Sequence, residues 1–156
     1  MNRVLPAIVT FIYMMFFTNV SFAIIHPEGT LEVSFINNTN YDCTINARLT
    51  HGEWVKNPPK SISKHKTISW SATQKCFFGP DMTIKFTCGD YSFSTRNQQN
   101  YCSLKGGNQT LSISDIDKHL NVTNRQIQHA AYGSEKPGKA QIVVTSKGKG
   151  RHFGFE

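Results

Sequence analysis

The sequence MTIKFTCGDYSF, residues 82–93, decides the fold class because it predicts a β-hairpin. Apolar residues occupy every second position from Met82 to Cys88, and threonine or lysine lies between them. This period of two is typical of a strand with one buried face. Gly89 and Asp90 follow as a two-residue turn, with glycine at the first central position as a type II′ turn requires. The chain is therefore expected to be rich in antiparallel β-structure.

Four cysteines lie outside the N-terminal apolar run, at Cys43, Cys76, Cys88 and Cys102. An even count in an exported chain of this size predicts two disulfides, and the spacing contains no CxxC pair of the kind that binds zinc. Three connectivities are possible. Because Cys43 and Cys88 both fall on the apolar faces of predicted strands, we expect a bridge Cys43–Cys88 inside the core. Cys76 and Cys102 lie in turn-rich surroundings and would form the second bridge.

Residues 1–23 have the pattern of a signal peptide. Arg3 supplies a positive start, Val4 to Phe17 is an apolar run, and Ser21 to Ala23 is a small-x-small cleavage site. An uncleaved N-terminal anchor helix is the alternative, but the run is short for a full membrane span. We therefore expect the protein to be secreted.

The rest of the chain has the length of a single domain, which we place at residues 24–146. Residues 147–156 form a basic, glycine-rich tail. The full chain has a formal net charge of +7, of which Arg3 contributes one. A positive charge of this size favours anionic surfaces, and it also keeps a protein soluble.

The same alternation predicts further strands at residues 31–35, 42–49, 67–72, 110–114 and 140–145. The polar cluster Asn37 to Asn40 would turn the chain, so residues 31–49 are expected to form a second hairpin. Residues 95–108 are polar and are expected to be a long loop. Residues 115–131 are expected to be a short helical or irregular insert, because Ser114 could cap a helix there.

About seven short strands with turns between them predict an all-β fold, an antiparallel β-sandwich. Its core is expected to consist of the inward residues of the predicted strands, namely Val33, Phe35, Ile45, Ile68, Trp70, Ile84, Phe86, Ile142 and Val144.

Residues 31–95 resemble the aegerolysin and actinoporin-like β-sandwich proteins, which include cytolysins. The resemblance lies in the order of motifs: the strand and polar turn Val33 to Thr39, Gly52-Glu53-Trp54, the pair Pro58-Pro59, the strand Thr67 to Trp70 and a hairpin. The four-cysteine pattern and the segment 115–135 depart from that family. The resemblance implies a two-sheet sandwich and binding to lipid or membrane surfaces.

The residues themselves offer one candidate binding surface, in which aromatic side chains lie among lysines. Its members are Trp54, Lys56, Lys60, Lys75, Phe77, Phe78 and Tyr101. Aromatic rings lie at the level of lipid head groups, and lysine ammonium groups pair with their phosphates. The alternative is that the aromatic residues belong to the core and the lysines to solvated loops.

Acid–base chemistry is the other candidate, because secreted basic proteins with two disulfides include ribonucleases. The available groups are His51, Glu53, His65, His119, His129 and Arg96. Their spacing brings no base and acid together, and no nucleotide-binding, hydrolase or metalloprotease motif is present. We therefore expect no enzymatic activity, no cofactor, no metal and no nucleic-acid partner.

Two classes of binding function stay open. The favoured one is a lipid- or membrane-surface binder, in the manner of a toxin. The alternative is a secreted effector or inhibitor that binds a protein or a glycan, which a flat polar groove or an exposed sheet edge would favour.

Overall fold

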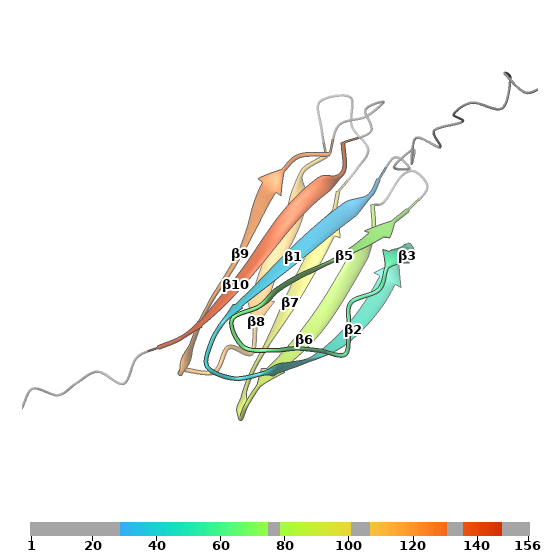
Figure 1. The fold of residues 1–156 in the computed structure, drawn as a ribbon. Helices are drawn as coiled ribbons and strands as arrows, with labels where there is room; N and C mark the ends of the chain where they lie inside the picture. Colours follow the sequence, from blue (N-terminus) through green and yellow to red (C-terminus); the bar gives the residue numbers. More distant parts are fainter. Residues whose placement is uncertain (1–28, 75–78, 101–106, 131–135, 148–156) are drawn as a thin grey trace, which may run out of the picture.

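The computed structural model describes residues 29–74, 79–100, 107–130 and 136–147, and these form a sandwich of two five-stranded sheets (Figure 1). The strands are β1 (Leu31–Asn38), β2 (Cys43–His51), β3 (Glu53–Lys56), β4 (Ser61–Ile62), β5 (Thr67–Thr73), β6 (Asp81–Cys88), β7 (Tyr91–Gln99), β8 (Gln109–Ser114), β9 (Leu120–Gln128) and β10 (Gly138–Ser146). The all-β sandwich is confirmed, with more strands than the sequence pattern predicted.

The first sheet, called sheet A, has the strand order β3-β5-β1-β10-β9, and the second, sheet B, has the order β4-β2-β6-β7-β8. Strands β1 and β10 pair in parallel, with Leu31 opposite Gly138. Every other pairing between the described strands is antiparallel. The first and last strands therefore lie side by side in the middle of sheet A (Figure 1).

The predicted hairpin is confirmed as β6 and β7, whose register places Phe86 opposite Phe93 and Cys88 opposite Tyr91. Gly89 has a φ of 59°, whereas the φ angle of Asp90 is not positive. This combination is that of a type II′ turn.

The predicted hairpin at residues 31–49 is wrong. Strand β1 belongs to sheet A and β2 to sheet B, so the segment between them crosses from one sheet to the other. Both strands have one apolar face, and burying these faces against each other places the strands in opposite layers. The alternation alone cannot distinguish two strands that pair edge to edge from two that pack face to face.

Two segments that were expected to lack strands also belong to the sheets. The predicted helical or irregular insert contains β9, and the predicted loop begins with the second half of β7, through Gln99. In both strands the inward positions include amides, and Asn97 and Gln99 are buried. A search for alternating apolar residues misses strands whose inner face is polar.

The core lies between the sheets and is centred on stacked aromatic rings. The ring of Phe86 lies 4.4 Å from that of Phe35 and 4.8 Å from that of Phe93, measured between centroids. Trp70 is buried beside them, and its indole N–H donates to the sulfur of Met82 at 3.3 Å. The predicted core residues are buried except Ile45 and Ile68, which are half-buried and pack against the core.

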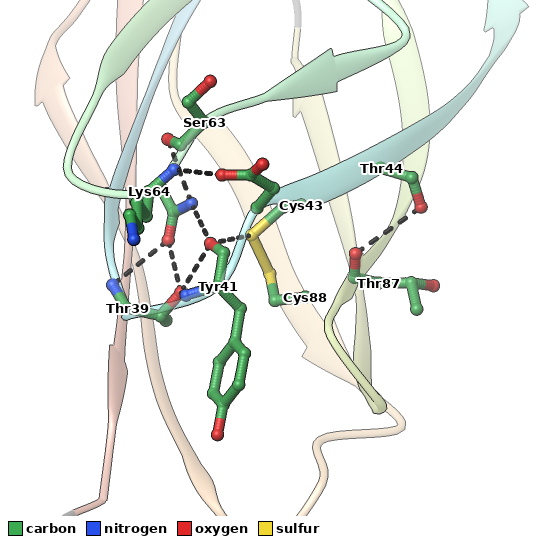
Figure 2. Close-up of a disulfide and its surroundings, with 10 residues drawn as sticks. Thr39, Tyr41, Cys43, Thr44, Ser63, Lys64, Thr87 and Cys88 are labelled. Atoms are coloured by element: carbon green, nitrogen blue, oxygen red, sulfur yellow. Dashed lines mark hydrogen bonds between the residues drawn. A yellow bond between two sulfur atoms is a disulfide. The ribbon is translucent and has the colours of Figure 1, made fainter.

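Cys43 and Cys88 form the expected disulfide, which crosses between β2 and β6 (Figure 2). Their Cα atoms lie 4.0 Å apart, which matches the narrow, non-hydrogen-bonded type of antiparallel pair. Both cysteines are buried. Cys76 and Cys102 lie outside the described residues, so the second bridge stays a prediction.

The expected signal peptide and nearly all of the expected tail also lie outside the described residues. Within the described part of the chain, no helix has the length and apolar character needed to cross a membrane.

Candidate functional site

One lateral side of the sandwich is closed by polar contacts from β7 and β8 of sheet B to the neighbouring β9 of sheet A. The side-chain Nδ2 of Asn97 donates to Asn124 Oδ1 at 2.9 Å, and Asn124 Nδ2 donates to the backbone carbonyl of Ser112 at 3.2 Å. Gln109 Nε2 donates to the carbonyl of Gln128 at 3.0 Å. These side chains bridge the edges of the two sheets, so this side offers few free groups to a ligand.

The opposite side is formed by the edge strands β3 and β4, and residues of both sheets line a hollow of about 330 Å³ here. Trp54 from β3 lines it together with Ile45 and Ala47 from β2. Pro58 and Lys60, from the connection between β3 and β4, lie in its wall. Because Trp54 is half-buried and packs against the core, it holds the inner wall of this hollow in place.

A β-bulge interrupts β3 inside this edge. Trp54 pairs with Ala72 of β5, whereas Lys56 pairs with the next residue, Ser71, so Val55 is the extra residue of the bulge. Ala72 faces the core and is buried, while Ser71 is on the outer face of sheet A. Val55 is 56% exposed, a large fraction for an apolar side chain.

The bulge also directs Lys56 to the outer face of sheet A. Its Nζ donates to Ser69 Oγ at 3.0 Å, beside a second hollow of about 470 Å³. Ser34 and Ile68 line this hollow, and Asn57 and Pro59 belong to both hollows. Trp54 and Lys56 therefore face different surfaces.

The candidate binding surface from the sequence is brought together only in part. Trp54 and Lys60 line one hollow, and Lys56 lies around the edge in the other. The remaining candidates, Lys75, Phe77, Phe78 and Tyr101, lie outside the described residues and stay predictions. The sequence analysis missed Val55, because it searched for aromatic and basic residue types and not for an exposed aliphatic side chain.

The groups considered for acid–base chemistry do not converge among the described residues. Arg96 forms a bidentate ion pair with the buried carboxylate of Asp81, at 3.0 and 2.7 Å, which raises the pKa of Arg96. His119 contacts Asp117, with 2.8 Å between Nδ1 and Oδ1. No cluster of three or more metal-binding side chains occurs in the ranges that the structure covers. The absence of enzymatic activity stays a prediction.

An aromatic cluster that the sequence did not indicate lies at the end of the sandwich that carries the β6–β7 turn. The ring of Tyr91 lies 5.6 Å from that of Tyr41, edge on, and 5.0 Å from that of His119. The nearby Tyr41, followed by partial desolvation, raises the pKa of Tyr91. Tyr41 is partly exposed, so this cluster is accessible from solvent.

The fold and the open edge together define the class of the protein as a two-sheet β-sandwich with an apolar and basic edge. No family model and no curated protein sequence matches the chain. Solved structures with a similar fold include the following two. One is IP-1A from Alcaligenes faecalis, with a TM-score of 0.55 and 13% identity over 80% of this chain and 95% of that one.

A second solved structure with a similar fold is the lipid binding protein Nakanori, with a TM-score of 0.59 and 11% identity. The match covers 76% of this chain and 71% of Nakanori. At identities this low, the structural similarity shows a shared fold alone. It confirms the two-sheet sandwich that the family resemblance implied.

Proposed function

We propose that this chain is a secreted lipid-binding protein that contacts membrane surfaces with the edge formed by Trp54, Val55 and Lys60. The exposed Val55 is the observation that carries the proposal. This apolar side chain is 56% exposed between Trp54 and Lys56, and the remaining residue of β3 is the exposed Glu53. Covering this apolar side chain with a membrane interface removes it from water, which favours binding.

The surrounding residues suit an interfacial position. Tryptophan partitions to the region of the lipid head groups, where its ring is in an apolar environment and its N–H stays hydrated. Lys60 is exposed beside the same hollow and would pair with lipid phosphates. Each lysine near an anionic leaflet contributes about 1 kcal/mol, and salt screens that contribution.

Two further findings support the proposal. The chain shares its fold with a protein described as lipid binding. Its buried disulfide is compatible with an oxidising, extracellular compartment. A toxin-like activity would in addition require membrane damage, which release of a trapped dye from vesicles would measure.

Vesicle pelleting with the oxidised protein tests the proposal. Trp54→Ala should weaken association with vesicles at every ionic strength, because burial of apolar area is not screened by salt. Lys60→Ala should weaken it mainly at low salt and only for anionic vesicles. Lys85→Ala is the matched control, since Lys85 is exposed on the outer face of sheet B.

The proposal fails if the wild-type protein pellets with neither neutral nor anionic vesicles at low salt. It also fails if Lys60→Ala and Lys85→Ala weaken association equally, since net charge would then account for all of the binding.

A further inference from the structure

A row of polar side chains crosses the outer face of sheet A, at right angles to the strands. Strand register places Ser34 of β1 opposite Ser69 of β5 on one side and opposite Gln141 of β10 on the other. Gln141 in turn pairs with Arg125 of β9. Lys56 of β3 reaches this row through its contact with Ser69. Each of the five strands of sheet A therefore contributes one member, and we call this set the polar row.

Hydrogen bonds hold both ends of the polar row. Lys56 Nζ donates to Ser69 Oγ at 3.0 Å. At the other end, Arg125 donates to Gln141 Oε1 from Nε at 3.2 Å and from Nη2 at 2.7 Å. The two long cationic side chains are thus already directed along the row, which lowers the entropy cost of binding a ligand there.

The cations at the two ends keep their charge available to a ligand. The acceptors of Lys56 and Arg125 are a hydroxyl and an amide oxygen, and neither cation takes part in an ion pair among the described residues. The neighbouring row differs, because Lys139 pairs there with Glu32 at 3.1 Å. The polar row therefore combines uncompensated positive charge at its ends with neutral hydrogen-bonding groups in its middle.

The dimensions of the polar row define the shape of a ligand. Four inter-strand spacings separate β3 from β9, which gives a span of about 19 Å. The hollow of about 470 Å³ lies at the Lys56 end, where Pro59 and Ile68 add apolar surface to its wall. A fitting ligand is extended, has hydroxyl groups along its length and has an apolar face and negative charges at intervals.

We infer that the polar row binds an acidic oligosaccharide laid across the strands. Sulfate or carboxylate groups would pair with Lys56 and Arg125, because charge-assisted hydrogen bonds are stronger than neutral ones. Sugar hydroxyls would exchange hydrogen bonds with Ser34, Ser69 and Gln141. This site does not rest on the proposed lipid contact, since Trp54 and Lys60 line the other hollow.

Titration calorimetry of the full chain with a heparin-derived tetrasaccharide tests the inference. Arg125→Ala should weaken binding about tenfold, the loss expected for one charge-assisted interaction. Lys56→Ala should have a similar effect at the other end. Arg48→Ala is the matched control, because Arg48 is exposed on the outer face of sheet B and carries the same charge. This control should change affinity less than about twofold, within the effect of a remote charge in salt.

Two neutral substitutions test the middle of the row. Ser34→Val and Gln141→Leu leave the net charge unchanged and should each weaken binding, whereas Thr44→Val, at an exposed position of β2, should not. Thermal melts of all the variants show whether each one is folded. An uncharged tetrasaccharide and a single-stranded DNA oligonucleotide serve as further probes.

The inference is overturned by any of three results. The first is that the wild-type protein does not bind the tetrasaccharide at low salt. The second is that Arg48→Ala weakens binding as much as Arg125→Ala, because the ligand would then respond to net charge alone. The third is that the DNA oligonucleotide binds as tightly and depends on Ser34 and Gln141 in the same way.

Discussion

Trp54 and Lys56 lie two residues apart on β3, yet their side chains face opposite surfaces of sheet A. In a regular strand, residues two apart share a face. The bulge at Val55 shifts the register, so that Trp54 pairs with Ala72 on the core side and Lys56 with Ser71 on the outer side. One strand of four residues thereby serves two different surfaces, the apolar edge and the polar row.

The exposed Val55 should be necessary for membrane association. Val55→Asp places a carboxylate where we expect contact with the membrane. Removing this charge from water is costly, so vesicle pelleting should be lost for neutral and anionic lipid alike. Ile127→Asp is the matched control, because Ile127 is 52% exposed against 56% for Val55 and lies on the far edge strand β9. Equal loss of pelleting in both variants would contradict the proposed edge. Unchanged melting temperatures would show that both proteins are folded.

Phe86→Ala should strongly destabilise the fold. Phe86 is fully buried and stacks on Phe35 and Phe93. Deleting a buried ring of this size costs about 3–5 kcal/mol of unfolding free energy. Denaturant unfolding measures the change, with Lys85→Ala on the exposed face of β6 as the neighbouring control. A loss below about 1 kcal/mol would show that the two faces of β6 are exchanged.

Removing the disulfide should destabilise the protein without changing its fold. Cys43 and Cys88 are separated by 45 residues, and bridges that close loops of this size contribute about 2–4 kcal/mol, chiefly by restricting the unfolded chain. The double variant Cys43→Ala with Cys88→Ala should therefore unfold at lower denaturant concentration with its far-UV circular dichroism spectrum retained.

Peptide mapping under non-reducing conditions should find Cys76 joined to Cys102. A bridge from either of these cysteines to Cys43 would contradict both disulfide assignments.

The sequence predicts those parts of the sandwich in which apolar and polar residues alternate. The β6–β7 hairpin, the buried faces of β1, β5 and β10, and the Cys43–Cys88 pair all follow from that pattern. It could not predict β9 or the second half of β7, where the inward residues include Asn97 and Asn124. Those amides satisfy each other across the sheets, and only the tertiary arrangement supplies that partner.

The candidate site was less predictable for a related reason. Trp54 and Lys60 were recognised by residue type, but their separation from Lys56 depends on a bulge of one residue. The polar row consists of serine, glutamine, lysine and arginine from five strands that are far apart in sequence. Its members become a set only when the strand order, with β1 beside β10, is known.

Asn37 should be essential for the connection between β1 and β2. It is fully buried; its Nδ2 donates to the carbonyls of Tyr41 at 2.8 Å and Ser63 at 3.3 Å, and its Oδ1 accepts from the hydroxyl of Thr39 at 2.7 Å. Figure 2 shows this connection close to the disulfide. Asn37→Ala removes the acceptor of the Thr39 backbone N–H and the donor to the Ser63 carbonyl, at about 1–3 kcal/mol for each group that stays buried and unpaired, whereas the Tyr41 carbonyl keeps the Thr39 hydroxyl as a donor. Asn38→Ala, at the exposed neighbouring position, should change the unfolding free energy by less than about 0.5 kcal/mol.

The loop between β8 and β9 should make stability depend on pH in the acidic range. The backbone N–H of His119 donates to Asp117 Oδ1 at 2.9 Å, and the His119 ring contacts the same oxygen at 2.8 Å. These two interactions, the backbone bond first, hold the pKa of Asp117 below its ordinary value of 3.8. Because the folded state lowers this pKa, the ionised carboxylate stabilises folding at pH values above 3.8. That contribution is lost as the pH falls from 3.8 through the lowered pKa of the folded state.

Asp117→Asn should therefore lower the melting temperature at neutral pH, and the difference from wild type should shrink towards zero in strong acid. Asp115→Asn removes a neighbouring carboxylate of the same loop without removing a contact to His119, so it controls for the change in net charge. Melting temperatures of the three proteins between about pH 2 and pH 7 make the comparison, over the range in which carboxylates titrate. A difference between wild type and Asp117→Asn that stays constant down to the lowest pH would show that the ionised carboxylate does not contribute. In that case the protonated, neutral carboxyl of Asp117 would accept the hydrogen bond from the His119 backbone as well as the ionised form does.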